Sequence, residues 1–157
     1  MNRKVSIIIP NYNHGKYIGE CIKSVIMQTY ADIEIIVIDN FSQDNTQQVV
    51  NEIKRENPSI NIIFLKFDNK GIIAASRNFG VRYATGTYLA FLDSDDVWEP
   101  EKLKIQIEYL INTDYSAIAT RFKPVGDIKN FFDHLDYMED KDSEIVSFES
   151  ILLSNSI

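Results

Sequence analysis

The hydrophobic residues of this chain follow two alternating patterns. Short, nearly continuous apolar runs occupy residues 5–9, 33–38, 60–67 and 87–92. Runs of this length that are rich in β-branched residues predict buried strands. The segments between the runs repeat apolar residues at intervals of three and four, which predicts amphipathic helices. Strands that alternate with helices are typical of βαβ units, so the pattern predicts an α/β fold.

Two helical stripes lie between the first three apolar runs. The first consists of Ile18, Cys21, Ile22, Val25 and Ile26. The second consists of Thr46, Val49, Val50 and Ile53. Asp44 and Gln47 have the spacing of a capping box, which predicts that the second helix begins between them.

Two further helices and one further strand are predicted beyond residue 70. A third helix is expected over residues 71–84, closed by Gly86 at its C-terminal end. Pro100 suits the first position of a fourth helix. The apolar stripe of that helix is Leu103, Ile107, Leu110 and Ile111. A fifth strand is predicted over residues 115–122.

The length of 157 residues fits one domain, so we predict a single domain over residues 1–157. Its expected architecture is a Rossmann-like, mostly parallel sheet with helices on both faces. Residues 127–144 are acidic and aperiodic and predict a loop, whereas residues 145–153 predict a short helix. Because no closing element precedes Ile157, we expect the domain to be truncated on its C-terminal side.

Composition and charge narrow the function. The formal net charge of −7 argues against a nucleic-acid partner, which requires a basic face. It also means that a phosphate-bearing ligand must be met by local cations. The single Cys21 fits a reducing compartment. No apolar stretch has the roughly 18 residues of a transmembrane helix. We therefore expect a cytoplasmic location, or in the full-length protein one peripheral to the inner face of the membrane.

Polar residues follow the first four predicted strands, and ligands of open parallel sheets bind beyond the carboxyl ends of the strands. The segments at these ends are residues 10–13, 39–42, 68–71 and 93–96. The last segment has three aspartates within four residues, and Asp93 and Asp95 point the same way if the strand conformation persists. Clustered carboxylates repel one another, and their oxygens suit Mn or Mg. A metal ion would also attract a diphosphate.

Several other site types are excluded. No G-x-G-x-x-G motif follows the first strand, which argues against a dinucleotide site, and Gly15-Lys16 lacks the residues of a P-loop. His14 has no partner at metal-ligand spacing and is interpreted as a surface residue near the predicted cleft. Cys21 lies on the apolar stripe of the first helix, so it is interpreted as a core residue rather than a nucleophile.

Four segments, in this order, resemble the signature motifs of family 2 glycosyltransferases. They are VSIIIPNYN at residues 5–13, IVIDNFS at 36–42, NKGIIAASRNFG at 69–80 and DSDDVW at 93–98. The resemblance implies the GT-A fold and inverting transfer from a nucleotide-diphosphate sugar, with UDP- and dTDP-sugars as the expected donors. It further implies Mn or Mg as cofactor and a saccharide or lipid-linked acceptor of unknown identity.

By position, the resemblance implies a nucleotide site made of Pro10, Tyr12, Asp39, Asn40, Arg77 and Asp93. Asp95 is expected to be the main metal ligand, with Asp93 facing the ribose or the metal. The chain departs from the family at Asn40, where a second aspartate is usual, and at Phe41, where a glycine is usual. The carboxylate that acts as general base is expected beyond Ile157. This chain alone is therefore expected to transfer no sugar at a useful rate.

Other functions remain open at this stage. A non-catalytic nucleotide-binding or regulatory module would retain the same donor half of the fold. A sugar nucleotidyltransferase would also use this architecture. An aspartate-dependent phosphatase is disfavoured, because its D-x-D motif would follow the first strand, which here leads into Pro10 and Asn11.

Overall fold

The computed structural model describes residues 3–120, nearly all of which belong to the first of two compact units, Met1–Ile118. The strands are β1 (Val5–Asn11), β2 (Ile33–Asp39), β3 (Asn61–Lys66) and β4 (Tyr88–Phe91). The helices are α1 (Ile18–Ile26), α2 (Thr46–Glu56), α3 (Ile73–Val81) and α4 (Lys102–Ile111). The loop predicted over residues 127–144 and the helix predicted over 145–153 lie outside the described residues.

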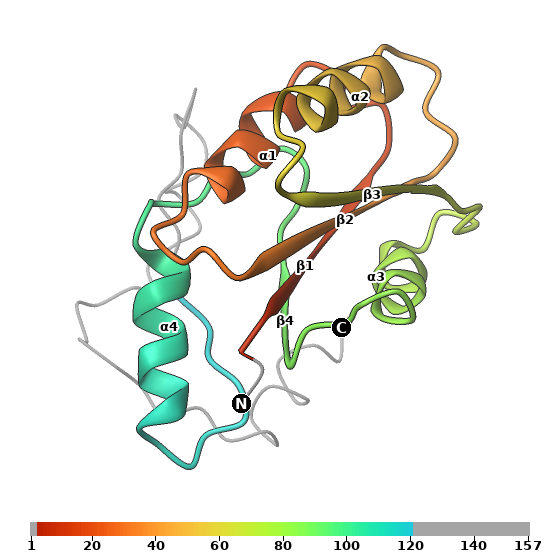
Figure 1. The fold of residues 1–157 in the computed structure, drawn as a ribbon. Helices are drawn as coiled ribbons and strands as arrows, with labels where there is room; N and C mark the ends of the chain where they lie inside the picture. The colour runs from red at the N-terminus through yellow and green to blue at the C-terminus, as the bar shows by residue number, and fades with distance from the viewer. Residues whose placement is uncertain (1–2, 121–157) are drawn as a thin grey trace, which may run out of the picture. The chain divides into compact units, whose positions relative to one another are not determined.

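The four strands form one parallel sheet in the order β3-β2-β1-β4 (Figure 1). β1 is central, and its Val5 pairs with Ile33 of β2 and with Tyr88 of β4. Pairing with β2 continues to the end of β1, whereas pairing with β4 stops where Ile8 meets Phe91. The α/β architecture predicted from the hydrophobic pattern is therefore confirmed.

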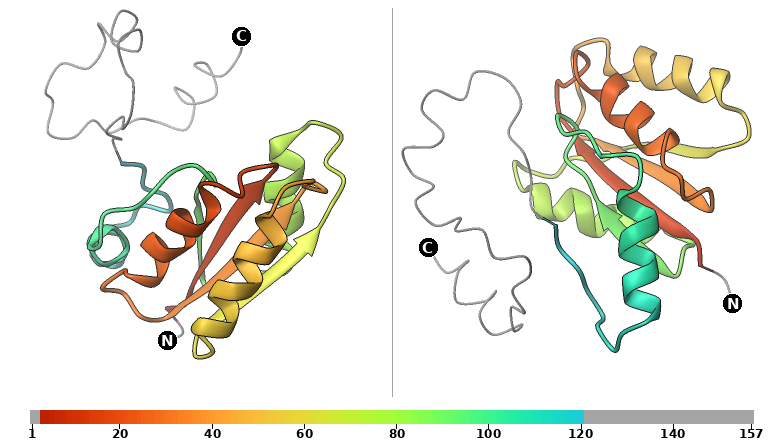
Figure 2. Two further views of the ribbon diagram at one scale, coloured as in Figure 1. Left: turned by 90° about the horizontal axis from the view of Figure 1, so that it is seen from above. Right: turned by 90° about the vertical axis from the view of Figure 1, so that its left-hand side faces the viewer.

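Helices cover both faces of the sheet because successive strand side chains point to opposite faces (Figure 2). Ile7, Ile9 and Val37 share one buried cluster with residues of α1, α2 and α4. Ile8, Ile36 and Ile38 form a second cluster, against which Phe79 of α3 packs. The predicted stripe of α1 is confirmed, since Ile18, Cys21, Ile22 and Val25 are all buried.

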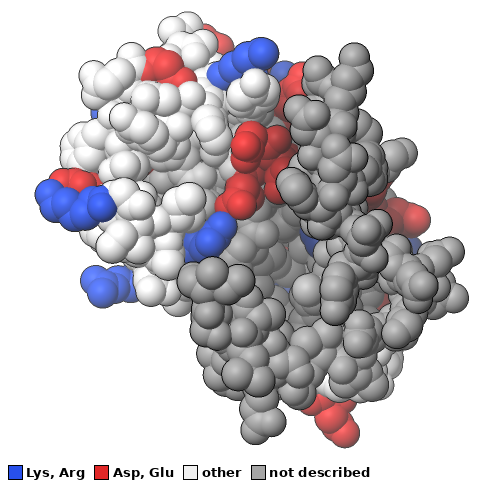
Figure 3. All heavy atoms as spheres, turned by 180° about the vertical axis from the view of Figure 1, so that it is seen from behind, with Lys and Arg blue, Asp and Glu red and all other residues white. Residues whose placement is uncertain are grey.

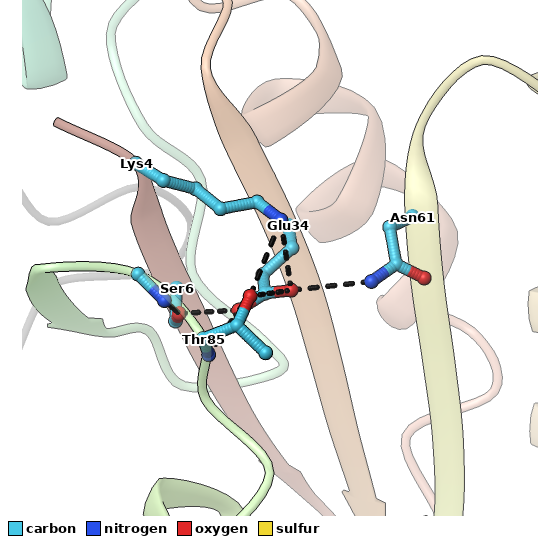
Figure 4. A network of polar contacts seen from close by, with 6 residues as sticks. Lys4, Ser6, Glu34, Asn61 and Thr85 are labelled. Carbon is cyan, nitrogen blue, oxygen red and sulfur yellow. Dashed lines mark hydrogen bonds and ion pairs between the residues drawn. The ribbon is translucent and has the colours of Figure 1, made fainter. Parts of the chain in front are cut away.

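Glu34 organises the amino-terminal end of the sheet (Figure 4). Its buried carboxylate accepts hydrogen bonds from Ser6 Oγ at 2.6 Å and Asn61 Nδ2 at 3.1 Å. It also accepts one from the Thr85 backbone N at 2.6 Å and lies 3.3 Å from Lys4 Nζ. Burial raises the pKa of Glu34, but the hydrogen bonds from Ser6, Thr85 and Lys4 outweigh it and lower the pKa to about 2. This carboxylate is therefore charged and fully engaged.

Two predictions, of a fifth strand and of the residue that caps α3, were wrong. The predicted fifth strand does not form over residues 115–120, the described part of 115–122, and Tyr115 is exposed there. Gly86 does not cap α3, which ends at Val81. A Cβ at Gly86 would lie 2.5 Å from Lys4 O, so this glycine permits a close backbone approach to β1 instead.

α2 begins at Thr46, between Asp44 and Gln47 as predicted, whereas α4 begins only at Lys102, beyond Pro100. The N-cap of α2 is Asn45, and the predicted capping box is not formed. The Asp44 carboxylate instead accepts hydrogen bonds from the backbone N of Thr46 at 3.0 Å and of Gly15 at 2.7 Å. Pro100 lies in the turn before α4, where its carbonyl accepts from Thr29 N at 2.9 Å. The predicted start of α2 is thus confirmed without its capping box, and Pro100 precedes α4 instead of opening it.

Candidate functional site

The carboxyl ends of β1 and β2 are joined by a buried polar network centred on Asn11. Asn11 Nδ2 donates to Asp39 Oδ1 at 3.0 Å, to Ser42 Oγ at 3.1 Å and to Thr46 Oγ1 at 3.3 Å. Ser42 in turn donates to both Asp39 oxygens, through its backbone N at 2.9 Å and its Oγ at 2.5 Å. Asp39 is only 1% exposed. It holds this turn in shape rather than presenting a free carboxylate to a ligand.

Pro10 and Tyr12, both predicted to line a base pocket, differ in accessibility. Pro10 is buried within β1, whereas Tyr12 is 55% exposed just beyond the strand. The backbone carbonyl of Ile8 points towards β4, where it accepts a hydrogen bond from Leu92 N. Because backbone groups alternate along a strand, the backbone N of Pro10 also points towards the β4 side. Pairing with β4 has ended there, and a proline without an N–H therefore costs no ladder hydrogen bond. Of the two residues, Tyr12 is the one a ligand can reach.

Asn40 connects the ends of β2 and β3. Its backbone N donates to Asn11 O at 2.9 Å, and its side-chain Oδ1 accepts from Asn69 N at 3.2 Å. Because a backbone N–H can only donate, this contact fixes the orientation of the Asn40 amide. Asn40 Nδ2 makes no hydrogen bond with other described residues. The carbonyl oxygen of this side chain is thus engaged, whereas its Nδ2 group remains available for a further hydrogen bond.

Asn69 shapes the loop between β3 and α3. Its Nδ2 donates to Ser76 Oγ at 3.0 Å, and its Oδ1 accepts from Gly71 N at 2.9 Å. Lys70 and Gly71 both have positive φ, 53° and 78°, which turns the chain sharply into α3. This turn places the N-terminal half of α3, including Arg77, at the carboxyl edge of the sheet.

The acidic motif follows β4 as a turn and not as an extension of the strand. β4 ends at Phe91, and Asp96 N donates to Asp93 O at 3.0 Å. The expectation that strand alternation aligns Asp93 with Asp95 was therefore wrong. The turn itself gathers the carboxylates, and Asp93, Asp95 and Asp96 are all exposed.

Buried contacts anchor this acidic turn to the segment that leads into α1. Ser94 is 3% exposed, and its Oγ lies 2.8 Å from His14 Nδ1. Cys21 Sγ lies 3.5 Å from Asp93 O. His14, interpreted from the sequence as a surface residue, thus tethers the turn. Cys21 is confirmed as a core residue.

Arg77 of α3 pairs with the acidic turn. Its guanidinium Nη2 donates to Asp93 Oδ1 at 2.6 Å. Two buried polar atoms have no hydrogen-bond partner among the described residues, Arg77 Nε and Asn11 Oδ1. Unpaired buried polar groups are uncommon in folded proteins. Both occur at the carboxyl edge of the sheet, where the sequence predicts the ligand.

The electrostatics of the turn favour a cation. Burial raises the pKa of Asp96, and the charges of Asp95 and Asp93 raise it further. Burial also raises the pKa of Cys21, to about 12, with added contributions from the same three aspartates. On the molecular face drawn in Figure 3, acidic side chains gather with basic ones beside them. At the acidic turn, the Arg77 guanidinium balances part of the negative charge through its ion pair with Asp93.

The carboxylates of the acidic turn suit a hard divalent cation that takes most of its ligands from water and substrate. No group of three or more His, Cys, Asp or Glu side chains in residues 3–120 is arranged to hold a metal ion. Mg and Mn need few protein ligands, since water and substrate phosphates complete their coordination. Asp95 makes no hydrogen bond or ion pair with the described residues and remains free for this role. Asp93 must share its carboxylate with Arg77.

Several residues that build the site were not assigned a role from the sequence. They are Asn11, Ser42, Asn69, His14 and Ser94. All but Ser94 lie next to or within the turns that follow β1, β2 and β3, and Ser94 lies between the predicted metal ligands. The signal available in the sequence was that polar residues of this kind recur near the end of each strand. Which of them would be buried depended on tertiary contacts.

Residues 6–153 match the family Glycosyl transferase family 2. The match covers most of the chain, so this chain belongs to the family 2 glycosyltransferases. It is 30% identical over 156 residues to the putative teichuronic acid biosynthesis glycosyltransferase TuaG of Bacillus subtilis, which covers 95% of this chain and 61% of TuaG.

Another curated relative is named for its reaction. The chain is 41% identical over 122 residues to the UDP-Glc:alpha-D-GlcNAc-diphosphoundecaprenol beta-1,3-glucosyltransferase WfgD of Escherichia coli. That alignment covers 78% of this chain and 47% of WfgD. The chain therefore spans less than two thirds of the length of either relative.

Solved structures place the fold in the same class. S. aureus TarS 1-349 in complex with UDP matches with a TM-score of 0.65 and 29% identity, over 80% of this chain and 39% of that one. The mannosyltransferase PcManGT from Pyrobaculum calidifontis, in complex with GDP-Man and Mn2+, matches with a TM-score of 0.66 and 25% identity, over 70% and 33%. The fold is the GT-A fold of glycosyltransferases. None of the helices in residues 3–120 is long and apolar enough to cross a membrane.

Proposed function

We propose that the chain binds a nucleotide-diphosphate sugar, with UDP- or dTDP-sugars as donors, at the carboxyl edge of its sheet. We further propose that a Mn or Mg ion takes part in binding. In the whole protein this site serves inverting glycosyl transfer to a saccharide or lipid-linked acceptor. Related structures support the donor class, since TarS has been solved in complex with UDP and with UDP-GlcNAc.

One observation carries the proposal: hydrogen bonds join the loops after all four strands into one surface. Asn11 links the β1 and β2 ends, and Asn40 links β2 to β3 through Asn69. His14 links the β1 loop to the acidic turn at Ser94. The edge of an open parallel sheet is where ligands bind in such folds. A surface held this way is preorganised, and little ordering cost remains when a ligand binds.

Asp95 and Asp93 would hold the metal ion, which would neutralise the diphosphate and assist its departure as leaving group. Mn2+ occurs with GDP-Man in the PcManGT complex, which supports this part of the proposal. Arg77 Nη2 lies 2.6 Å from Asp93 Oδ1 and the side chain is 35% exposed, so the guanidinium is placed to donate to the phosphate oxygens. A cation near the acidic turn is required because three carboxylates would otherwise repel the donor.

Base and ribose would occupy the turns after β1 and β2. The Asn40 N–H groups are suited to donate to a ring carbonyl of uracil or thymine. Tyr12 offers an exposed ring on which a base can stack. Asp39 supports this surface from below through Asn11 and Ser42.

The transfer step itself follows from the chemistry of inversion. The acceptor hydroxyl oxygen forms a bond to the anomeric carbon as the bond from that carbon to the diphosphate oxygen breaks. The hydroxyl proton passes to a general base, and the nucleoside diphosphate leaves. A positioned base typically contributes about 10²–10⁴-fold to such a step. No described residue is assigned to that role.

Calorimetry on the full chain tests the donor site. UDP, dTDP, GDP and CDP are titrated separately with Mn, and again with EDTA in place of the metal. We expect UDP or dTDP to bind most tightly, and at least about 10-fold more weakly in EDTA, as expected when a metal's coordination is disturbed. Equal affinity in EDTA would remove the metal from the proposal, and failure of all four nucleotides to bind would reject the donor site.

A further inference from the structure

Phe41 has a backbone conformation that costs energy for an aromatic residue. Its φ is +56°, in the left-handed region. In this region the Cβ crowds the neighbouring backbone, so glycine is favoured and bulky residues are uncommon. A bulky residue held there persists only when the surrounding structure imposes the conformation, and such strain concentrates at functional sites.

The strain at Phe41 is imposed by its neighbours. Asn40 N is bonded to Asn11 O at 2.9 Å, and Ser42 N is bonded to Asp39 Oδ2 at 2.9 Å. The turn is thus fixed on both sides of Phe41 by the buried network around Asp39. Any residue at position 41 must adopt the same φ.

The ring of Phe41 gives no packing in return for this strain. The residue is 51% exposed and belongs to neither buried hydrophobic cluster. Its ring makes no aromatic contact within residues 3–120. The side chain therefore gains little hydrophobic burial that would offset the cost of the positive φ.

Tyr12 lies on the turn directly alongside. Asn11 O is bonded to Asn40 N, and Asn13 N is bonded to Ser42 Oγ at 2.8 Å. These contacts join the segments on either side of Tyr12 and Phe41. The two aromatic residues are therefore the middle residues of two neighbouring turns, and both are exposed.

We propose that Phe41 is a specificity-determining residue that stacks on the nucleobase of the donor, together with Tyr12. A nucleobase suits this surface because its flat ring can stack on an aromatic side chain. Its polar edge can at the same time form a hydrogen bond with the Asn40 amide. The inference rests on the proposed function, because the base must lie at the ends of β1 and β2. It goes beyond that function by giving a role to Phe41, which stands where a glycine is usual in the family.

The test compares Phe41→Leu, Phe41→Tyr and Phe41→Gly in the full chain, each titrated with UDP and with pyrophosphate in the presence of Mn. Phe41→Leu retains an apolar side chain but loses the ring, and we expect it to weaken UDP binding by about 10-fold, in line with loss of one stacking contact. Phe41→Tyr is expected to bind UDP within about 2-fold of the unaltered chain. Pyrophosphate has no base, so its affinity is expected to be the same in all variants.

The melting temperature separates a ligand contact from a structural role. Phe41→Gly removes the ring and relieves the strain, so it should lose UDP affinity without a fall in melting temperature. If Phe41→Leu binds UDP as tightly as the unaltered chain does, Phe41 does not stack on the base. The proposed donor site is not affected by that result. Parallel loss of pyrophosphate binding also overturns the assignment of Phe41, because the effect then arises from a disturbed site. If the unaltered chain binds no nucleotide, the proposed function fails and this inference fails with it.

Discussion

Arg77 Nη2 lies 2.6 Å from Asp93 Oδ1, so a cation from α3 reaches the acidic turn that follows β4. The two side chains are 35% and 51% exposed, and a pair this accessible contributes only about 0–1 kcal/mol to stability. Its position at the edge of the sheet is better explained by ligand binding than by folding.

Replacement of Arg77 by Gln should weaken binding of UDP with Mn by about 10-fold, because a charge-assisted contact to phosphate is lost. The melting temperature should change little. Arg82→Gln is the matched control: it removes the same charge at an exposed position at the end of the same helix. Calorimetry on both variants is decisive, and equal losses would show that only the overall charge matters.

Asp95→Asn should abolish the metal-dependent part of UDP binding and leave the fold intact. Asp95 has no protein partner among the described residues, so its loss breaks no structural contact. The expected fall in metal affinity is about 10-fold or more. Asp114→Asn, at an exposed position beyond α4, controls for the change in charge. A folded Asp95→Asn protein that responds to Mn as before would place the metal elsewhere.

Stability should fall in acid because of Glu34. Its pKa is lowered from 4.5 to about 2 in the folded chain. A lowered folded-state pKa stabilises the protein above the unfolded value, and this stabilisation is lost as the pH falls from about 4.5 towards 2. Glu34→Gln should cost on the order of 2 kcal/mol at pH 7. It should also flatten the acid dependence in this range.

Denaturant unfolding at a series of pH values measures both effects of Glu34. Glu56→Gln, at the exposed end of α2, is the control and should alter neither stability nor its pH dependence appreciably. UDP affinity at pH 7 should be unchanged in folded Glu34→Gln, since the Glu34 network lies at the other end of the strands. An unaltered acid profile in Glu34→Gln would assign the acid sensitivity to other carboxylates.

The Cys21 thiol should be inert in the native protein. Burial raises its pKa to about 12, and only the thiolate reacts with disulfide reagents. At pH 8 we expect modification by such a reagent to proceed no faster than unfolding, and to become rapid in guanidinium chloride. Absorbance of the released thiolate follows the reaction. Rapid labelling without denaturant would mean that α1 leaves the sheet readily.

The sequence predicted those elements whose side chains are buried on both faces or along one clear stripe. β1 and β2 are nearly all apolar, so their strands could be recognised without knowledge of their neighbours. The same holds for α1, whose four buried residues match its stripe. The four motifs and their order also predicted which family the chain belongs to, because together they resemble the signature motifs of that family.

The remainder depended on contacts between residues distant in sequence. His14 reaches Ser94 across 80 positions, and no local pattern predicts such a pair. The role of Gly86 was misjudged because a glycine after a helix has the same local signature whether it caps the helix or lies against another strand. Asp93 and Asp95 were expected to align through strand geometry, but the chain turns where β4 ends.

The Glu34 network also contributes to the register in which the strands pair. A slip of one residue moves every side chain of a strand to the opposite face of the sheet. Because β1 and β2 are buried on both faces, hydrophobic burial alone distinguishes weakly between such alignments. Glu34 aligns with Ser6 on one side and Asn61 on the other, and bonds to both. A slip by one residue would turn its carboxylate into the apolar layer beneath α1 and α2, and a slip by two would remove its partners. The hydrogen bonds of this one buried side chain thus favour the observed alignment of β1, β2 and β3.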